Sequence, residues 1–158
     1  KLGLLPNVEV ADLALDFVKA HAETPVVLDP VLVCKENHDV EVSALQDELI
    51  KFFPYKNIIT PNLPEAELLV QKELRTLEDV KEAARHLYSL GAKSVVIKGG
   101  NRLDIQKAID VYYDGKQFKT GHGAGRLYCF IQQKRHSARY GGQRTGRQED
   151  YPAAGTSR

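Results

Sequence analysis

The chain has 158 residues, a length typical of one globular domain, and 42% of its residues are hydrophobic, enough for a core. Its formal net charge of +1 gives no indication of binding to nucleic acid or to an anionic membrane. Its apolar runs are too short to cross a bilayer and it shows no signal-peptide pattern, so we expect a cytoplasmic protein. Because two cysteines do not make a disulfide scaffold, we expect Cys34 and Cys129 to be free thiols.

The first half of the chain alternates apolar runs with helical patterns. Lys1–Leu5 is typical of the end of a strand, and Asn7 is a favourable N-cap for a helix over Val8–His21. Val26–Leu28 predicts a strand. The next helix is expected to open at Ser43, where Gln46 completes a capping box, and to stop before Pro54. The expected apolar faces are Val10, Leu13, Ala14, Phe17 and Val18 on the first helix, and Leu45, Leu49, Ile50 and Phe53 on the second.

The second half continues this alternation and ends in a hairpin. A strand over Asn57–Thr60 precedes a short helix through Ala66 and Leu69. Thr76 caps a longer helix that Gly91 ends. The buried stripe of that helix is expected to be Val80, Ala83, Ala84 and Leu87. Val95–Ile97 predicts the next strand, and Asp114-Gly115 predicts a turn between Ile109–Tyr113 and Gln117–Lys119.

Strands that alternate with helices indicate an α/β fold with a mostly parallel sheet covered by helices. The terminal hairpin is expected at an antiparallel edge of that sheet. Composition changes after Gly125, because residues 126–158 are rich in Arg, Gln and Gly and have almost no apolar periodicity. We therefore divide the chain into a domain over residues 1–125 and a poorly ordered tail over residues 126–158.

Polar clusters follow three of the predicted parallel strands. Asp29-Pro30 follows the first, Asn62 and Glu65 follow the second, and Lys98-Gly99-Gly100 follows the third. Ligands of open α/β sheets bind at the carboxyl edge of the strands, where all three clusters would meet. A carboxylate, an amide with a second carboxylate, and a lysine beside glycines suit a phosphate bound to Mg²⁺.

Each cluster also has a purely structural interpretation. Asn62 and Glu65 have the spacing of a helix capping box, and both interpretations can hold at once. Asp29 before proline can simply end a strand, and Lys98 can stand in an ordinary turn. Gly121–Gly125 can present backbone N–H groups to an anion, or can be a flexible loop in which His122 has no chemical role.

Four segments together resemble the hydroxymethylpyrimidine kinase family of the ribokinase-like superfamily, in particular its bacterial pyridoxal/pyridoxine kinase branch. They are Leu28–Lys35, Ile59–Glu67, Val96–Gly100 and His122–Gly125, and they occur in the family's order. The resemblance extends over residues 1–125. It implies an incomplete three-layer ribokinase-like fold. It also implies phosphorylation, dependent on ATP and Mg²⁺, of a hydroxymethyl group on a pyridine or pyrimidine vitamin precursor.

The resemblance also implies roles for individual residues. Asp29 and Glu65 would lie at the metal, and Cys34 would engage the substrate aldehyde. The nucleotide-binding positions would be Asn62, Lys98, Gly100 and Asp110, and the anion hole would be formed by Gly123, Ala124 and Gly125. The complete relatives commonly form homodimers.

Two departures from the family pattern limit the expected activity. The family's N-terminal portion, with its Gly-rich substrate segment, has no counterpart here. The catalytic base position, Cys in this family, is Arg126, and a guanidinium group does not accept a proton. A truncated kinase with impaired activity is therefore our first interpretation. The alternatives are a catalytically inactive fragment or gene remnant, and another ribokinase-like kinase for sugars or nucleosides.

Overall fold

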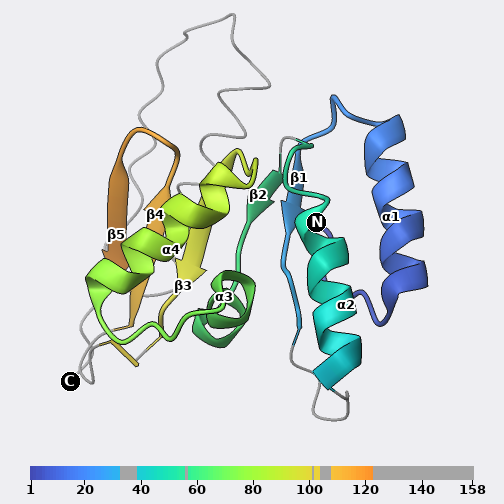
Figure 1. Cartoon of the computed structure of the whole chain (residues 1–158). Helices are drawn as coiled ribbons and strands as arrows, with labels where there is room; N and C mark the ends of the chain where they lie inside the picture. Colours follow the sequence, from blue (N-terminus) through green and yellow to red (C-terminus); the bar gives the residue numbers. More distant parts are fainter. Residues whose placement is uncertain (33–38, 56, 101, 104–107, 123–158) are drawn as a thin grey trace, which may run out of the picture.

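A five-stranded mixed sheet lies at the centre of the computed structural model, which describes residues 1–32, 39–55, 57–100, 102–103 and 108–122 (Figure 1). The strands are β1 (Val26–Leu28), β2 (Asn57–Ile59), β3 (Ser94–Lys98), β4 (Ile109–Tyr113) and β5 (Phe118–His122), and they lie side by side in that order. Strands β1, β2 and β3 are parallel, whereas β4 and β5 pair antiparallel. This confirms the predicted parallel sheet with a hairpin at its edge.

The start of the chain extends the sheet beyond β1. Leu2 forms a parallel bridge with Leu28. Its N–H donates to the Val27 carbonyl at 2.9 Å, and its own carbonyl accepts from the Asp29 N–H at 2.9 Å. The predicted strand end at Lys1–Leu5 is confirmed at this bridge.

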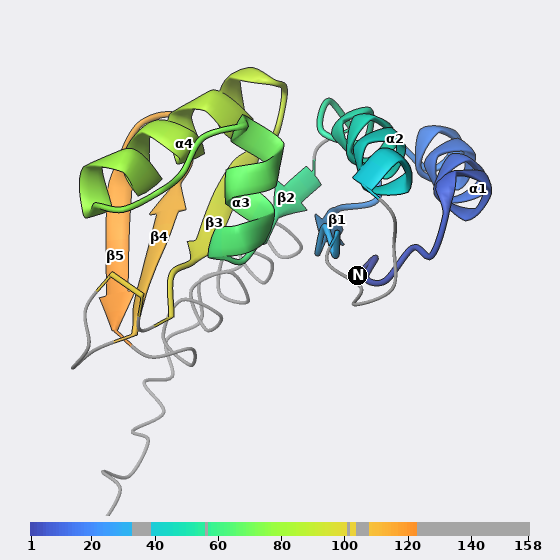
Figure 2. The ribbon, with the colours of Figure 1, turned by 60° about the horizontal axis from the view of Figure 1, so that its bottom comes forward.

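The described helices cover one face of the sheet (Figure 2). They are α1 (Val8–Ala20), α2 (Asp39–Ile50), α3 (Leu63–Val70) and α4 (Leu77–Ser89). The chain moves from β1 to β3 in one direction across the sheet, so right-handed crossovers place the connecting helices on the same side. The described residues therefore supply two of the three expected layers. Among the described helices, none has the length and apolar character needed to span a membrane.

The main core lies between the helices and the sheet. Leu28, Ile59, Val95 and Ile97 are fully buried there, on alternate positions of their strands. Val96 and Tyr112, on the intervening positions, form a separate small cluster with Ile58. The period of two thus separates two faces of the sheet, one toward the helices and one away from them.

Helix ends follow local capping chemistry. The Asn7 side chain accepts from the Val10 N–H at 2.9 Å, and Thr76 forms a reciprocal capping box with Asp79 at the start of α4. Gly91 takes φ +110° after α4, a conformation that L side chains rarely adopt. The predicted stripe of α4 is buried as expected: Val80, Ala83, Ala84 and Leu87.

Two details of the first two helices were predicted wrongly. Helix α2 begins at Asp39, four positions before Ser43, because residues 39–42 contain no glycine or proline to stop it. Helix α1 buries Ala11, Leu15 and Val18, so only Val18 of the expected face is fully buried. The expected residues Val10, Leu13 and Phe17 are exposed. Helix α1 is apolar on two sides, and periodicity alone did not show which side packs inward.

The different burial of two leucines, one on α4 and one on α1, predicts different losses of stability when each is replaced by alanine. Leu87→Ala on α4 should destabilise the fold by about 2–5 kcal/mol, because the Leu87 side chain is fully buried. Leu13→Ala, at a side chain that is 72% exposed, should change the stability by less than about 0.5 kcal/mol. Urea denaturation of both variants measures the difference. Equal losses would show that α1 packs through the face that contains Leu13.

Candidate active site

The strand alternation brings four polar side chains to one corner of the sheet. Asp29 follows Leu28, Lys98 follows Ile97, and Asp110 precedes Val111, each next to a residue that faces the helices. Their own side chains therefore belong to the opposite face. Thr60 follows Ile59 in the same way. Since β4 runs antiparallel to β3, with Lys98 opposite Asp110 in the register, all four lie at the same edge.

An ion pair links the first and third strands at this corner. The Lys98 ammonium donates to Asp29 Oδ1 at 2.8 Å, although the two residues are 69 positions apart in the sequence. The Thr60 hydroxyl group lies between them and donates to the Leu28 carbonyl at 3.3 Å, with Asp29 Oδ1 at 3.4 Å. The convergence of Asp29 and Lys98 predicted from the sequence is confirmed. Thr60 was not predicted, although its hydroxyl at a strand end was a usable signal.

The N-terminus of α3 adds the second cluster to this corner. The Glu65 N–H donates to Asn62 Oδ1 at 2.8 Å, and the Asn62 N–H donates to Glu65 Oε2 at 2.7 Å. This reciprocal pair is the predicted capping box. Asn62 also bridges Lys98 in parallel, and the Lys98 N–H donates to the Pro61 carbonyl at 2.8 Å. The capping box is therefore fixed directly beside the ion pair.

The pKa values of the carboxyl groups at this corner are shifted in opposite directions. Burial alone would raise the pKa of Asp29, but the ammonium groups of Lys98 and Lys1 together hold it below its ordinary 3.8. Burial raises the pKa of Glu65, although the Asn62 N–H and the charge of Lys98 oppose the shift. Burial likewise raises the pKa of Asp110, against the Gly99 N–H and Lys98.

A glycine is required where β3 leaves this corner. A Cβ atom on Gly99 would lie 2.1 Å from the Ile109 carbonyl oxygen, closer than any real contact. Gly100 follows with φ +55°, and its carbonyl accepts from the Ile109 N–H at 3.1 Å. The Lys98-Gly99-Gly100 turn thus brings the backbone close to β4 while Lys98 itself remains at the edge.

The remaining predicted site residues lie outside the described residues. They are Cys34, Gly123, Ala124, Gly125 and Arg126, and their roles stay predictions. Strand β5 ends at His122, which pairs with Ile109 at the same edge as Lys98 and Asp110. The last described residue before the glycine-rich segment is therefore at the candidate site.

The corner offers oxygen ligands of the kind that Mg²⁺ prefers, from Asp29 and Glu65. Among the residues that the structure describes, no three histidine, cysteine or acidic side chains are grouped closely enough to hold a metal by themselves. Magnesium commonly keeps several waters and uses one or two carboxylates together with substrate phosphates. The donor set fits that mode of binding.

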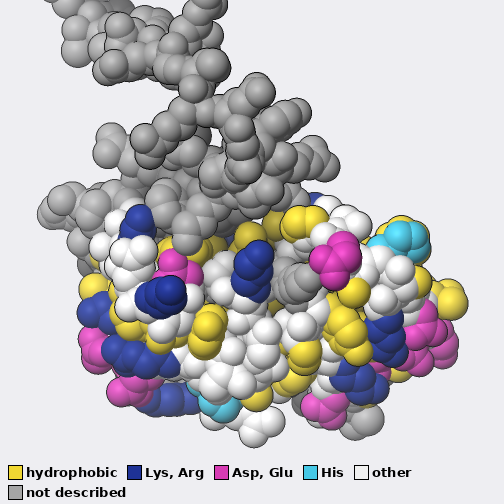
Figure 3. All heavy atoms as spheres, turned by 90° about the horizontal axis from the view of Figure 1, so that it is seen from above, with side chains coloured by type: hydrophobic (Ala, Val, Ile, Leu, Met, Phe, Trp, Pro, Cys, Tyr) yellow, Lys and Arg dark blue, Asp and Glu magenta, His cyan; other side chains and the backbone are white. Residues whose placement is uncertain are grey.

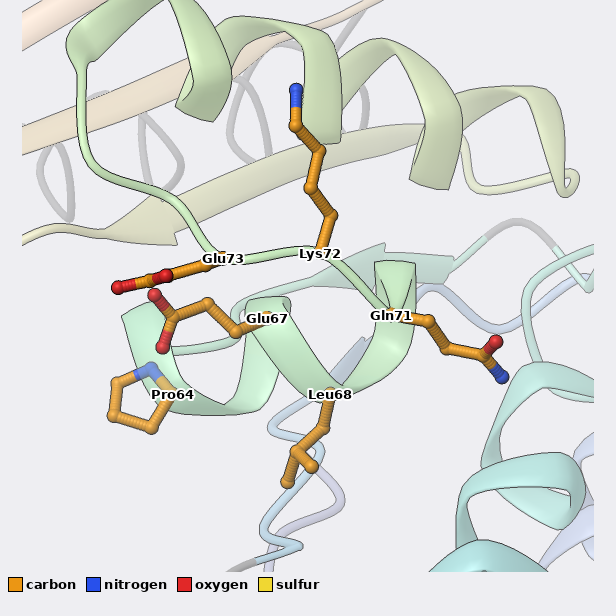
Figure 4. Close-up of a pocket in the computed structure, with 6 residues that line it drawn as sticks. All are labelled: Pro64, Glu67, Leu68, Gln71, Lys72 and Glu73. Carbon is orange, nitrogen blue, oxygen red and sulfur yellow. The ribbon is translucent and has the colours of Figure 1, made fainter.

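A surface hollow of about 470 Å³ lies beside α3 (Figure 4). It is lined by Pro64, Glu67, Leu68, Gln71, Lys72 and Glu73. Its charged side chains are already paired: Glu67 with Arg102 at 3.1 Å, Lys72 with Asp79 at 3.1 Å, and Glu73 with Arg75 at 2.7 Å. The face of the molecule seen from above, in Figure 3, carries acidic and basic side chains interspersed among its described residues.

A corner of this kind, at the carboxyl edge of an α/β sheet, defines a candidate phosphate-binding site. The family model described as phosphomethylpyrimidine kinase matches residues 1–125. The chain therefore belongs to the phosphomethylpyrimidine kinase family.

Known relatives give the same assignment. The hydroxymethylpyrimidine/phosphomethylpyrimidine kinase of Aquifex aeolicus is 42% identical over 142 residues, which cover 81% of this chain and 54% of that protein. The ADP complex of Bacillus subtilis pyridoxal kinase matches with a TM-score of 0.69 and 40% identity, over 77% of this chain and 46% of that one. The structure of Staphylococcus aureus pyridoxal kinase with AMP-PCP and pyridoxal matches with a TM-score of 0.65 and 36% identity. This match covers 75% of this chain and 42% of that one. The chain thus spans about half the length of these relatives.

The two lysines on Asp29 predict how stability depends on pH. Because the folded-state pKa of Asp29 is lowered, its ion pairs stabilise the fold above pH 3.8, and this contribution is lost as the pH falls through the folded-state value. Asp29→Asn should therefore cost about 1 kcal/mol at pH 7. The difference from wild type should shrink below pH 3.8, as measured by urea denaturation at several pH values.

Asp16→Asn is the matched control, because Asp16 forms an exposed pair with Lys19 at 3.1 Å on α1. This control should change the free energy of unfolding by less than about 0.5 kcal/mol at every pH measured. A constant difference between Asp29→Asn and wild type across this pH range would contradict the proposed ion pairing.

Proposed function

We propose that this chain carries the nucleotide site of an ATP- and Mg²⁺-dependent kinase. The kinase phosphorylates the hydroxymethyl group of a vitamin B6 precursor, pyridoxal or pyridoxine, or of hydroxymethylpyrimidine. The observation that carries the proposal is the Asp29–Lys98 pair beside the Asn62–Glu65 capping box, at the carboxyl edge of a parallel sheet. Family membership and the relatives' complexes with ADP, AMP-PCP and pyridoxal support it.

The described residues would act by binding and by compensating charge. Lys98 would turn from Asp29 to phosphate oxygens of the nucleotide, with which a lysine forms charge-assisted hydrogen bonds. Asp29 and Glu65 would hold Mg²⁺, in part through waters. The metal, when bound, neutralises charge on the polyphosphate. Asp110 and Gly100 border the same corner on the side of β4 and would contact the nucleotide.

The reacting end of the site would come from the predicted segment after His122. The backbone N–H groups of Gly123, Ala124 and Gly125 would stabilise the charge on the transferring phosphoryl group. Cys34 would engage the substrate aldehyde. Arg126 stands at the base position and cannot take a proton from the hydroxymethyl group.

A second candidate function is a nucleotide-binding chain without catalysis, and the arginine at position 126 favours it. A gene remnant without a stable fold is the extreme form of this alternative. A sugar or nucleoside kinase of the same superfamily is disfavoured by membership in the phosphomethylpyrimidine kinase family. In either function the proposed partners are small molecules in the cytoplasm, with no nucleic acid or membrane, and the complete parent is proposed to be a homodimer.

Binding of Mg-ADP should stabilise the wild-type chain against heat. At one hundred times the Kd, a ligand specific to the folded state adds about 2.7 kcal/mol, which corresponds to a rise in Tm of roughly 5–10 °C. Lys98→Gln should remove most of this rise. Differential scanning fluorimetry with and without Mg-ADP measures the effect.

Lys93→Gln is the control for this experiment. Lys93 is exposed and immediately precedes β3, whereas Lys98 ends the same strand at the candidate site. The control should keep the full rise in Tm. If both variants lose the rise in Tm, or if neither does, the nucleotide binds elsewhere. If the chain shows no cooperative unfolding transition, it is a gene remnant without a stable fold.

Turnover should be very low even where nucleotide binds. A general base typically contributes about 10²–10⁴-fold to the rate, and Arg126 cannot supply this contribution. We expect little or no pyridoxal-5′-phosphate from the purified chain with ATP, Mg²⁺ and pyridoxal, as followed by absorbance and chromatography. Robust product formation would show that another group accepts the proton.

A further inference from the structure

Lys1 reaches the candidate site from a strand that the sequence motifs do not include. Leu2 bridges Leu28 and packs against the main core, so the preceding residue belongs to the other face of the sheet. That face also carries Asp29 and Lys98. Lys1 is thus brought to the site by strand register, as Lys98 is, but from the opposite side of β1.

The two lysines hold different oxygens of one carboxylate. The Lys1 ammonium lies 3.2 Å from Asp29 Oδ2, and the Lys98 ammonium lies 2.8 Å from Asp29 Oδ1. The side chain of Asp29 is only 18% exposed, whereas that of Lys1 is 57% exposed. The carboxylate is therefore held from both sides along the sheet, with the hydroxyl group of Thr60 as a third neighbour.

We propose that Lys1 is a positioning residue that keeps Asp29 oriented toward the candidate site when Lys98 leaves it for a phosphate group. This inference rests on the proposed nucleotide site. Once Lys98 turns away, Asp29 Oδ1 becomes free for a cation, and the carboxylate could rotate if nothing held Oδ2. Lys1 fixes that second oxygen and keeps a compensating positive charge beside the carboxylate as the anionic nucleotide arrives.

A double-mutant cycle separates positioning from direct contact with phosphate. Mg-ADP binding to the full chain is measured by titration calorimetry for wild type, Lys1→Gln, Asp29→Asn and the double variant. If Lys1 acts through Asp29, Lys1→Gln weakens binding about fivefold in the presence of Asp29 and less than about 1.5-fold in the Asp29→Asn background. Lys1→Arg should restore most of the affinity.

Lys19→Gln is the matched control, because Lys19 is another exposed lysine paired with an aspartate, Asp16 on α1. It should leave the affinity for Mg-ADP unchanged. An equal loss from Lys1→Gln in both backgrounds would indicate that Lys1 contacts the nucleotide itself, and no loss would show that Lys1 has no role. Either result overturns the proposal.

Failure of the proposed function would be recognised separately. If the wild-type chain does not bind Mg-ADP, the nucleotide site is wrong. The same four variants are then compared by urea denaturation without nucleotide. A coupling between Lys1 and Asp29 in the unfolding midpoints would support the positioning of Asp29, and strictly additive midpoints would overturn it.

Discussion

The candidate site depends on an ion pair that spans three strands. Neighbouring strands are about 4.8 Å apart, so β1 and β3 are separated by roughly 9.6 Å with β2 between them. A lysine has the length to cross most of this distance, and Lys98 does so to reach Asp29. The pair forms only if β1, β2 and β3 are parallel and in the observed register. The geometry of the site is thus a direct consequence of the sheet topology.

The acidic side chains of this corner share one charged neighbour, Lys98. Burial opposes the charge on the carboxyl groups of Asp29, Glu65 and Asp110. Lysines overcome that effect for Asp29, whereas Glu65 and Asp110 keep raised pKa values. Under the proposed function, a cation held by Asp29 and Glu65 would favour the charged form of both carboxyl groups.

Local sequence patterns predicted the parts of the site that short segments determine. Asn62 and Glu65 are three positions apart, so the capping box required no knowledge of the rest of the fold. Asp29 and Lys98 were placed together because each follows an apolar run, and parallel strands end at one edge. The crossing of β2 by Lys98 depends on register between distant segments and could not be predicted in this way.

Predictions failed where two local signals competed or where tertiary packing decided. Ser43 has good capping chemistry, but the helix continues through it to Asp39 because nothing earlier breaks it. Helix α1 has apolar side chains on two sides, and its position beside α2 selects Ala11, Leu15 and Val18 for burial. Lys1 reaches Asp29 only because Leu2 pairs with β1, a contact between segments more than twenty positions apart. Non-local pairing carries no local sequence signal.

The proposed division of the site between the sheet edge and the segment after His122 would have a kinetic consequence. In the proposed site, Lys98 and Asp29 would interact with the phosphates in the ground state as well as in the transition state, so they would contribute mainly to affinity. A general base acts only as the proton leaves the acceptor hydroxyl group, so its loss lowers kcat and leaves affinity largely intact. An arginine at the base position would also attract the anionic nucleotide equally before and during transfer. An arginine at the proposed base position would therefore favour binding without turnover, while the sheet edge keeps the Asp29–Lys98 pair.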